Sequence, residues 1–179
     1  MFKGKLKKYL PSAEDINNNR VLKVFGRYLT QPSLWHLNRH SVARGLAIGL
    51  VTGLIPGPVQ ILLAAALSIP FRANLPVAAF TTFYTNPFTF VPLYILAYKI
   101  GSFTMGVTAP MPPVTEFSGE NWFQMARKLW DWIYGLGDTL LIGLAIQCSL
   151  FAVVGYTLVQ LIWVWQVRRK WKRRHLHAK

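Results

Sequence analysis

The stretch GLAIGLVTGLIPGPVQILLAAALSI, residues 45–69, decides the fold that the sequence predicts. It holds no charged side chain over a length that suffices to cross a hydrocarbon layer of about 30 Å. The triplet Pro56-Gly57-Pro58 falls near its centre, where two prolines remove backbone donors and clash with the preceding helical turn. We therefore expect a hydrophobic segment that is broken at these prolines.

A second apolar segment, residues 75–98, has the same character. Pro87 and Pro92 interrupt it, and Asn86 directly precedes the first of them. Backbone groups that are released at membrane depth are tolerated only when they are buried in protein or face a wet cavity. The breaks of both segments should therefore point inward, and paired interruptions of this kind are the sequence feature that points to a transporter binding site.

A third apolar segment, residues 139–167, contains neither charge nor proline and predicts a long transmembrane helix. The positive-inside rule places the basic tail 168–179 and the basic, amphipathic N-terminal segment 1–31 in the cytoplasm. The number of crossings is then even, so one of the two broken segments is a re-entrant hairpin. Arg72 favours residues 45–69 for that role, and which broken segment crosses stays open.

Composition supports a membrane location. Apolar residues make up 53% of the chain and charged residues only 15%. The net charge of +14 is concentrated at the two ends, which suits an anionic membrane surface better than nucleic acid. The predicted fold class is an all-α membrane protein with a membrane domain over 32–167, including an interfacial loop and short helix over 109–131.

Polar side chains at and beside the breaks define a candidate site for a lipid phosphate. Guanidinium groups fit phosphate oxygens in bidentate fashion, and carboxamides with helix N-termini can hold an anionic group. The alternatives are that the cations reach ordinary headgroups and that the amides only repair the broken backbone. The candidate residues are Arg39, Arg44, Gln60, Arg72 and Asn86.

Glycines recur every four residues through the first apolar segment and would share one helix face. Small residues let another backbone approach closely, which predicts tight packing. The same face could instead offer a smooth surface to a lipid chain or a moving helix. These glycines are Gly45, Gly49, Gly53 and Gly57.

The sequence gives no support for catalysis. The six acidic residues all lie outside the apolar segments, and no nucleophile has a base at a recognisable spacing. His36 and His40 are four residues apart, as metal ligands sometimes are, but no third ligand is evident nearby. We therefore expect neither an enzyme, a metal site nor a cofactor.

An ordered set of motifs along the chain resembles the bacterial family called domain of unknown function twenty sixty-two. The resemblance covers about residues 20–167 and implies a small inner-membrane protein of Gram-negative bacteria, with no catalytic residues to carry over. Relatives fused to glycosyltransferase-like domains imply a place in envelope lipid or polysaccharide pathways. The motifs are Arg39-His40-Ser41-Val42-Ala43-Arg44-Gly45, Arg72-Ala73-Asn74-Leu75-Pro76 and Thr85-Asn86-Pro87-Phe88-Thr89.

These features together predict a multi-pass protein of the bacterial inner membrane with both termini in the cytoplasm. The leading hypothesis is a transporter or flippase component for lipid or polyprenyl phosphates in envelope biogenesis. The alternative is a structural or assembly protein that binds a partner through its glycine face and basic tail. Membrane lipids are the expected partners, with self-association or another membrane protein as further expectations.

Overall fold

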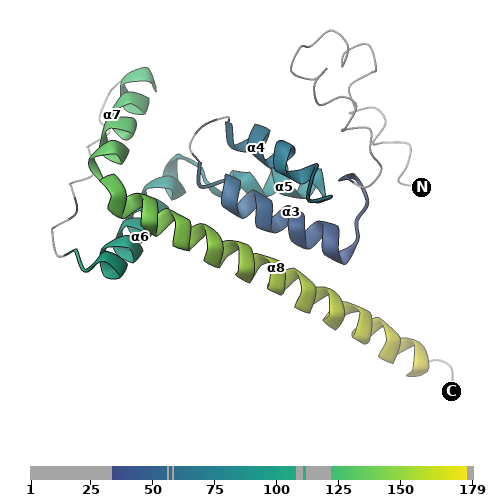
Figure 1. Cartoon of the computed structure of the whole chain (residues 1–179). Coiled ribbons are helices and arrows are strands. Elements are labelled where there is room, and N and C mark those ends of the chain that lie inside the picture. Colours follow the sequence, from purple (N-terminus) through teal and green to yellow (C-terminus); the bar gives the residue numbers. More distant parts are fainter. Residues whose placement is uncertain (1–33, 56, 58, 108–110, 112–121, 177–179) are drawn as a thin grey trace, which may run out of the picture.

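The computed structural model describes residues 34–55, 57, 59–107, 111 and 122–176, and all regular secondary structure in this part is helical. The predicted segment 1–31, both prolines of the first break and most of the loop before residue 122 lie outside the described residues. The elements, shown in Figure 1, are α3 (Arg39–Thr52), α4 (Val59–Ser68), α5 (Leu75–Thr81), the 3₁₀ helix η3 (Thr82–Tyr84), α6 (Pro87–Met105), α7 (Trp122–Gly135) and α8 (Gly137–Leu176).

The first apolar segment forms a pair of helices joined by a reversal of the chain. Helix α3 begins at Arg39, before the apolar run, because Asn38 caps it by accepting hydrogen bonds from the backbone N–H groups of His40 and Ser41. The chain reverses after α3, where Gly57 has a φ of 91°, a left-handed conformation that glycine adopts without strain. Helix α4 then runs back beside α3, so residues 45–69 are broken as predicted.

The second apolar segment contains one break and not two. Asn86 caps α6 by accepting hydrogen bonds from the N–H groups of Phe88 and Thr89, and Pro87 stands at the first helical position, where a missing donor has no cost. The prediction that Pro92 breaks a helix is wrong, because this residue lies inside α6. It stands near the helix start, so only the carbonyl one turn earlier loses its donor, which membrane helices tolerate.

The glycine face of α3 is covered by α5 and η3 of the same chain. A β-carbon added at Gly45 would come within 2.6 Å of the Asn74 carbonyl oxygen, and one at Gly49 within 2.5 Å of the Ala78 carbonyl oxygen. A β-carbon at Gly53 would meet the ring of Tyr84. A β-carbon added at Gly57 would have no neighbour within 4 Å, so the packed glycine face ends at Gly53.

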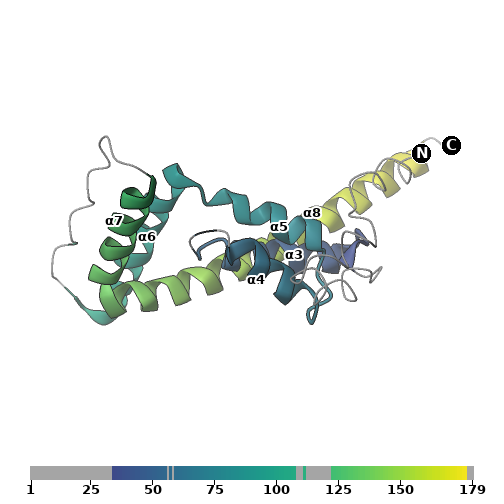
Figure 2. The same cartoon turned by 90° about the horizontal axis from the view of Figure 1, so that it is seen from above.

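Helix α8 is the common packing partner of the other elements. Its 40 residues span about 60 Å, and it crosses α6 first and then runs along α3 (Figures 1 and 2). Gly143 lies against the Ala97 backbone of α6, and Gly155 lies against Leu50 of α3. The helix extends beyond residue 167, where the predicted membrane span ends: α8 continues to Leu176 through a run of good helix formers without a glycine or proline to end it.

Helix α7 lies near the N-terminal end of α8, and it overlaps the second half of the predicted interfacial loop and short helix over 109–131 and ends four residues after that range. Its described residues are Trp122–Gly135, and its amphipathic sequence buries Trp132 while Trp130 and Tyr134 stay exposed. The buried side meets α6 and α8 in one apolar cluster. The cluster contains Tyr94, Ala97, Tyr98, Trp132, Leu136 and Leu140.

Two helices in the described part of the chain are long and apolar enough to cross a membrane. They are Phe88–Met105 within α6 and Gly137–Arg169 within α8. Only 22% of the first span and 17% of the second are buried inside the protein, whereas the core helix of a soluble protein is mostly buried. Their apolar side chains therefore face outward, as Phe88 and Phe103 do with exposures of 88% and 92%.

Candidate functional site

The candidate Arg44, in the first half of α3, contacts the backbone beside the candidate Arg72. The Arg44 Nη1 donates a hydrogen bond of 3.0 Å to the Phe71 carbonyl, and this carbonyl belongs to the peptide unit that joins Phe71 to Arg72. Both arginines are exposed. Arg44 uses one of its five N–H donors in this hydrogen bond, so the other donors remain available to bind a ligand.

The backbone at Arg72 is strained. Its φ of 48° is the left-handed conformation that non-glycine residues rarely adopt, and it is the only described residue other than glycine with a positive φ. Residues in such conformations cluster at functional sites, because the surrounding structure must hold them there. The turn between α4 and α5 thus holds the Arg72 backbone in a defined conformation, next to the peptide unit that Arg44 contacts.

Arg39 lies at the same end of α3 but takes part in a different contact. Its Nε donates a hydrogen bond of 2.9 Å to His40 Nε2. The other nitrogen, His40 Nδ1, lies 3.4 Å from the Tyr156 hydroxyl and 3.1 Å from Gln160 Nε2, both on α8. His40 therefore links α3 to α8, and the described residues contain no group of three potential metal ligands.

The opposite end of α3 is closed by hydroxyl groups. The Tyr84 hydroxyl donates to the Leu50 carbonyl at 2.7 Å, and the Tyr94 hydroxyl donates to the Leu54 carbonyl at 2.7 Å. The Thr85 hydroxyl donates to the Gly53 carbonyl. Carbonyls at a helix end have no intrahelical partner, so these three contacts satisfy the groups that the break releases.

The two candidate carboxamides lie at this closed end and are engaged within the chain. Gln60 Oε1 lies 3.2 Å from the Thr85 hydroxyl. Asn86 Oδ1 accepts the two N–H groups at the start of α6, at 2.9 and 3.0 Å. Asn86 therefore satisfies backbone groups at the break, as in the structural alternative that the sequence left open, whereas Gln60 contacts a side chain and no backbone group.

The five candidate residues do not form one pocket. Arg39, Arg44 and Arg72 lie at the start of α3, whereas Gln60 and Asn86 lie at its end. Nine residues separate Arg44 from Gly53, which at 1.5 Å per residue places the two groups roughly 14 Å apart. The cationic group is the one whose donors remain available.

Sequence reasoning missed Gln147. This residue lies within the apolar part of α8, is fully buried, and has no hydrogen-bond partner for either amide atom. A strongly polar residue in the middle of a predicted transmembrane helix is the signal that could have identified it.

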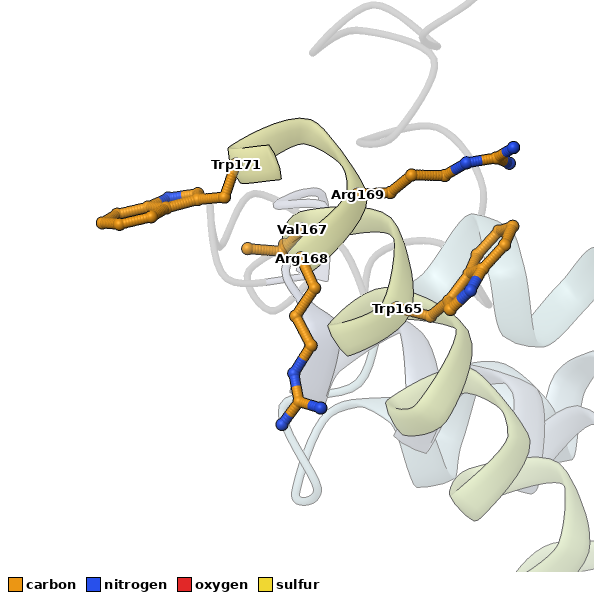
Figure 3. Close-up of a pocket in the computed structure, with 5 residues that line it drawn as sticks. All are labelled: Trp165, Val167, Arg168, Arg169 and Trp171. Carbon is orange, nitrogen blue, oxygen red and sulfur yellow. The ribbon is translucent and has the colours of Figure 1, made fainter. Parts of the chain in front are cut away.

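The described residues that line a hollow beside the far end of α8 all belong to that helix. Arg169 lies over the Trp165 ring, with its Cζ 4.8 Å from the ring centre, while Trp171 points to the other side of the helix (Figure 3). Tryptophan with arginine is the pairing expected at the boundary between lipid and water. The lining residues are Trp165, Val167, Arg168, Arg169 and Trp171.

The fold and the site together define an all-helical protein with two helices that are long and apolar enough to cross a membrane, and with a helical hairpin packed beside one of them. The chain belongs to the family described as an uncharacterized protein conserved in bacteria (DUF2062), whose profile matches residues 22–172. This match confirms the resemblance found in the sequence motifs. No curated protein and no solved structure matches the chain.

Proposed function

We propose that this chain is a multi-pass protein of the bacterial inner membrane that binds a phosphate-bearing lipid, as a component of a transporter or flippase for lipid or polyprenyl phosphates. The observation that carries the proposal is the contact of Arg44 with the Phe71 carbonyl, which places an exposed guanidinium group against the peptide unit that precedes a second exposed arginine, Arg72. Two guanidinium groups at one place suit the oxygens of a phosphate better than isolated cations do.

The hairpin of α3 and α4 supports a re-entrant position. These helices have 14 and 10 residues, each fewer than the roughly 20 that cross a hydrocarbon layer. The start of α3 contacts α8 at Tyr156 and Gln160, toward the basic end of α8. The arginine pair and the basic end of α8 therefore share one side, which the positive-inside rule makes the cytoplasmic side.

The surroundings of the arginine pair suit a lipid rather than a soluble anion. Phe71, whose carbonyl holds Arg44, is itself 57% exposed, and Leu67 on the preceding turn is 36% exposed. An acyl chain can lie against these apolar side chains while its phosphate meets the arginines. A soluble anion would gain nothing from the apolar part of this surface.

The alternative is a structural or assembly protein that binds a partner through its glycine face and basic tail. Of these two surfaces, only one remains available in the described structure. The glycine face is filled by α5, as the close approach of Gly45 and Gly49 to α5 carbonyls shows, so it is not available to another protein. The basic end of α8 is the remaining surface, and its helical continuation to Leu176 favours it as a docking element.

Native mass spectrometry of the full chain, released gently from membranes, tests the proposal. We expect wild-type protein to retain a phosphate-bearing lipid selectively, and Arg44→Ala and Arg72→Ala to lose most of it while still folding. Lys99→Ala is the matched control, because Lys99 is also an exposed cation but lies on α6. Unchanged lipid retention in both arginine variants would remove the site, and one stoichiometric protein partner without selective lipid would favour the assembly protein.

A further inference from the structure

The Gln147 carboxamide is a buried polar group that the fold leaves unpaired. Its side chain is fully buried, and neither Nε2 nor Oε1 has a hydrogen-bond partner. Buried amides are nearly always hydrogen-bonded, because an amide taken out of water without a partner is costly. A polar residue inside an apolar membrane helix marks a functional site by default.

The neighbours of Gln147 along α8 show which elements it faces. One turn before it, Gly143 contacts the Ala97 backbone of α6, and one turn after it, the Phe151 ring contacts the Tyr84 ring of η3 at 6.4 Å. The adjacent Cys148 directs its Sγ toward the Val51 carbonyl of α3, at 3.9 Å. Gln147 therefore lies on the part of α8 that passes the closed end of α3 and the junction of η3 with α6.

The polar groups at this junction are uncharged. The hydroxyls of Tyr84, Thr85 and Tyr94 already donate to α3 carbonyls, so their protons are committed. Each of those carbonyl oxygens keeps a second lone pair. A charged ligand would find no counter-charge among these groups, whereas a small neutral group with both donor and acceptor capacity matches them.

Ser102 of α6 is also buried without a partner, but its case is different. A serine hydroxyl on a helix can rotate to the carbonyl one turn earlier, as Ser149 does toward Ala145 at 2.8 Å. The carboxamide of Gln147 has two donors and two acceptor lone pairs, which one rotation cannot satisfy. Gln147 is therefore the group that needs an external partner.

We propose that Gln147 is the hydrogen-bonding residue of a second site, at the helix breaks, which binds a single hydroxyl group. The hydroxyl belongs to a water molecule or to a lipid headgroup, since both present the same donor and acceptor. This site is separate from the arginine pair, and it does not depend on the phosphate proposal.

Solid-state NMR of the full chain in bilayers tests this site directly. Cys148 is the only cysteine, so carbon-labelled glutamine combined with nitrogen-labelled cysteine gives a single backbone signal from the Gln147–Cys148 pair and assigns Gln147 without any substitution. Polarisation transfer from water or lipid hydroxyl protons to the Gln147 side-chain amide is then measured. Gln160, whose amide contacts His40 near the polar end of α3, serves as the hydrated reference.

The lipid composition separates the two sources of the hydroxyl. Phosphatidylcholine has no headgroup hydroxyl, whereas phosphatidylglycerol has two. Transfer to Gln147 in both bilayers, comparable with that at Gln160, identifies bound water, and transfer in phosphatidylglycerol alone identifies the lipid hydroxyl. Transfer to Gln160 but not to Gln147 in either bilayer overturns the proposal.

A substitution gives the second measurement. Gln147→Leu keeps the volume of the side chain and removes its polar atoms, so the transfer signal must vanish while the matched Gln160→Leu leaves it unchanged. If a signal persists in Gln147→Leu, another group produces it and the proposed site is wrong. The labelled wild-type chain still decides the question if the leucine variant does not fold.

Discussion

The two ends of α3 differ in whether their hydrogen-bonding groups remain free for a ligand. At its start, Arg44 and Arg72 are exposed and keep most of their donors free. At its end, the carbonyls of Leu50, Gly53 and Leu54 are each met by a hydroxyl from η3, from α6 or from Thr85 between them. A polar residue beside a helix break can thus be wholly engaged in holding the fold, and ligand contacts are to be sought where donors remain.

The largest expected effect on stability comes from disrupting the packing of α3 against α5, between the two ends of α3. In Gly49→Val the added β-carbon would lie 2.5 Å from both the Ala78 carbonyl oxygen and the Thr81 β-carbon, so α3 and α5 must separate. We expect a loss of about 3 kcal/mol in the free energy of unfolding, measured in detergent micelles. Gly135→Ala is the control, because nothing lies within 4 Å of its added atom. An equal loss in both variants would contradict the packing role.

A smaller loss is expected from opening the closed end alone. Tyr94→Phe keeps the ring and removes the hydroxyl, so the buried Leu54 carbonyl loses its donor. Leaving such a group unpaired costs about 2 kcal/mol, observable as a lower unfolding free energy. Tyr134→Phe, at a tyrosine that is 71% exposed, should change stability by less than about 0.5 kcal/mol. If the two variants are alike, the carbonyl does not depend on Tyr94.

The cap of α6 should have an intermediate effect. Asn86→Ala removes the acceptor of the Phe88 and Thr89 N–H groups, and loss of a helix cap costs about 1 kcal/mol. Asn86→Ser should recover most of this stability, because serine caps helices nearly as well. An equal loss in the serine variant would show that Asn86 acts through something other than capping.

The smallest effect on stability is expected at the cationic end. Arg44→Gln removes an exposed hydrogen bond to Phe71, which should change the unfolding free energy by less than about 0.5 kcal/mol. Retention of phosphate-bearing lipid, measured on the same samples, should fall sharply. A stability loss as large as that of Tyr94→Phe would instead make Arg44 a structural clamp.

The sequence predicted the local features of the fold well. The first break follows from Pro56 and Pro58, the α6 cap from Asn86 before Pro87, and the long apolar helix from residues 139–167, because each depends on neighbouring residues. The prediction that Pro92 breaks a helix was wrong, because the effect of a proline depends on how far it lies from the start of its helix. The continuation of α8 through the basic tail to Leu176 was not predicted, because a change from apolar to basic residues ends a membrane span but not a helix.

The candidate site was predicted less completely, because its contacts join distant parts of the chain. Tyr84 and Leu50 are 34 residues apart in the sequence, and Tyr94 and Leu54 are 40 apart, so no local pattern shows that these hydroxyls close the break. Likewise, no local pattern shows that Gln60 and Arg44 lie near opposite ends of α3. Gln147 was overlooked because its lack of a partner is visible only once its neighbours are in place.

Helix α8 is the last of the described helices along the chain, so it is synthesised last. Helices α3 to α6 leave the ribosome before α8, which is the helix that both α3 and α6 pack against. During synthesis the faces that pack against α8 therefore stay without this partner until α8 has emerged. Stable tertiary structure therefore forms only after α8 has emerged, and a chain that stops before α8 lacks the shared partner that joins the hairpin to the rest.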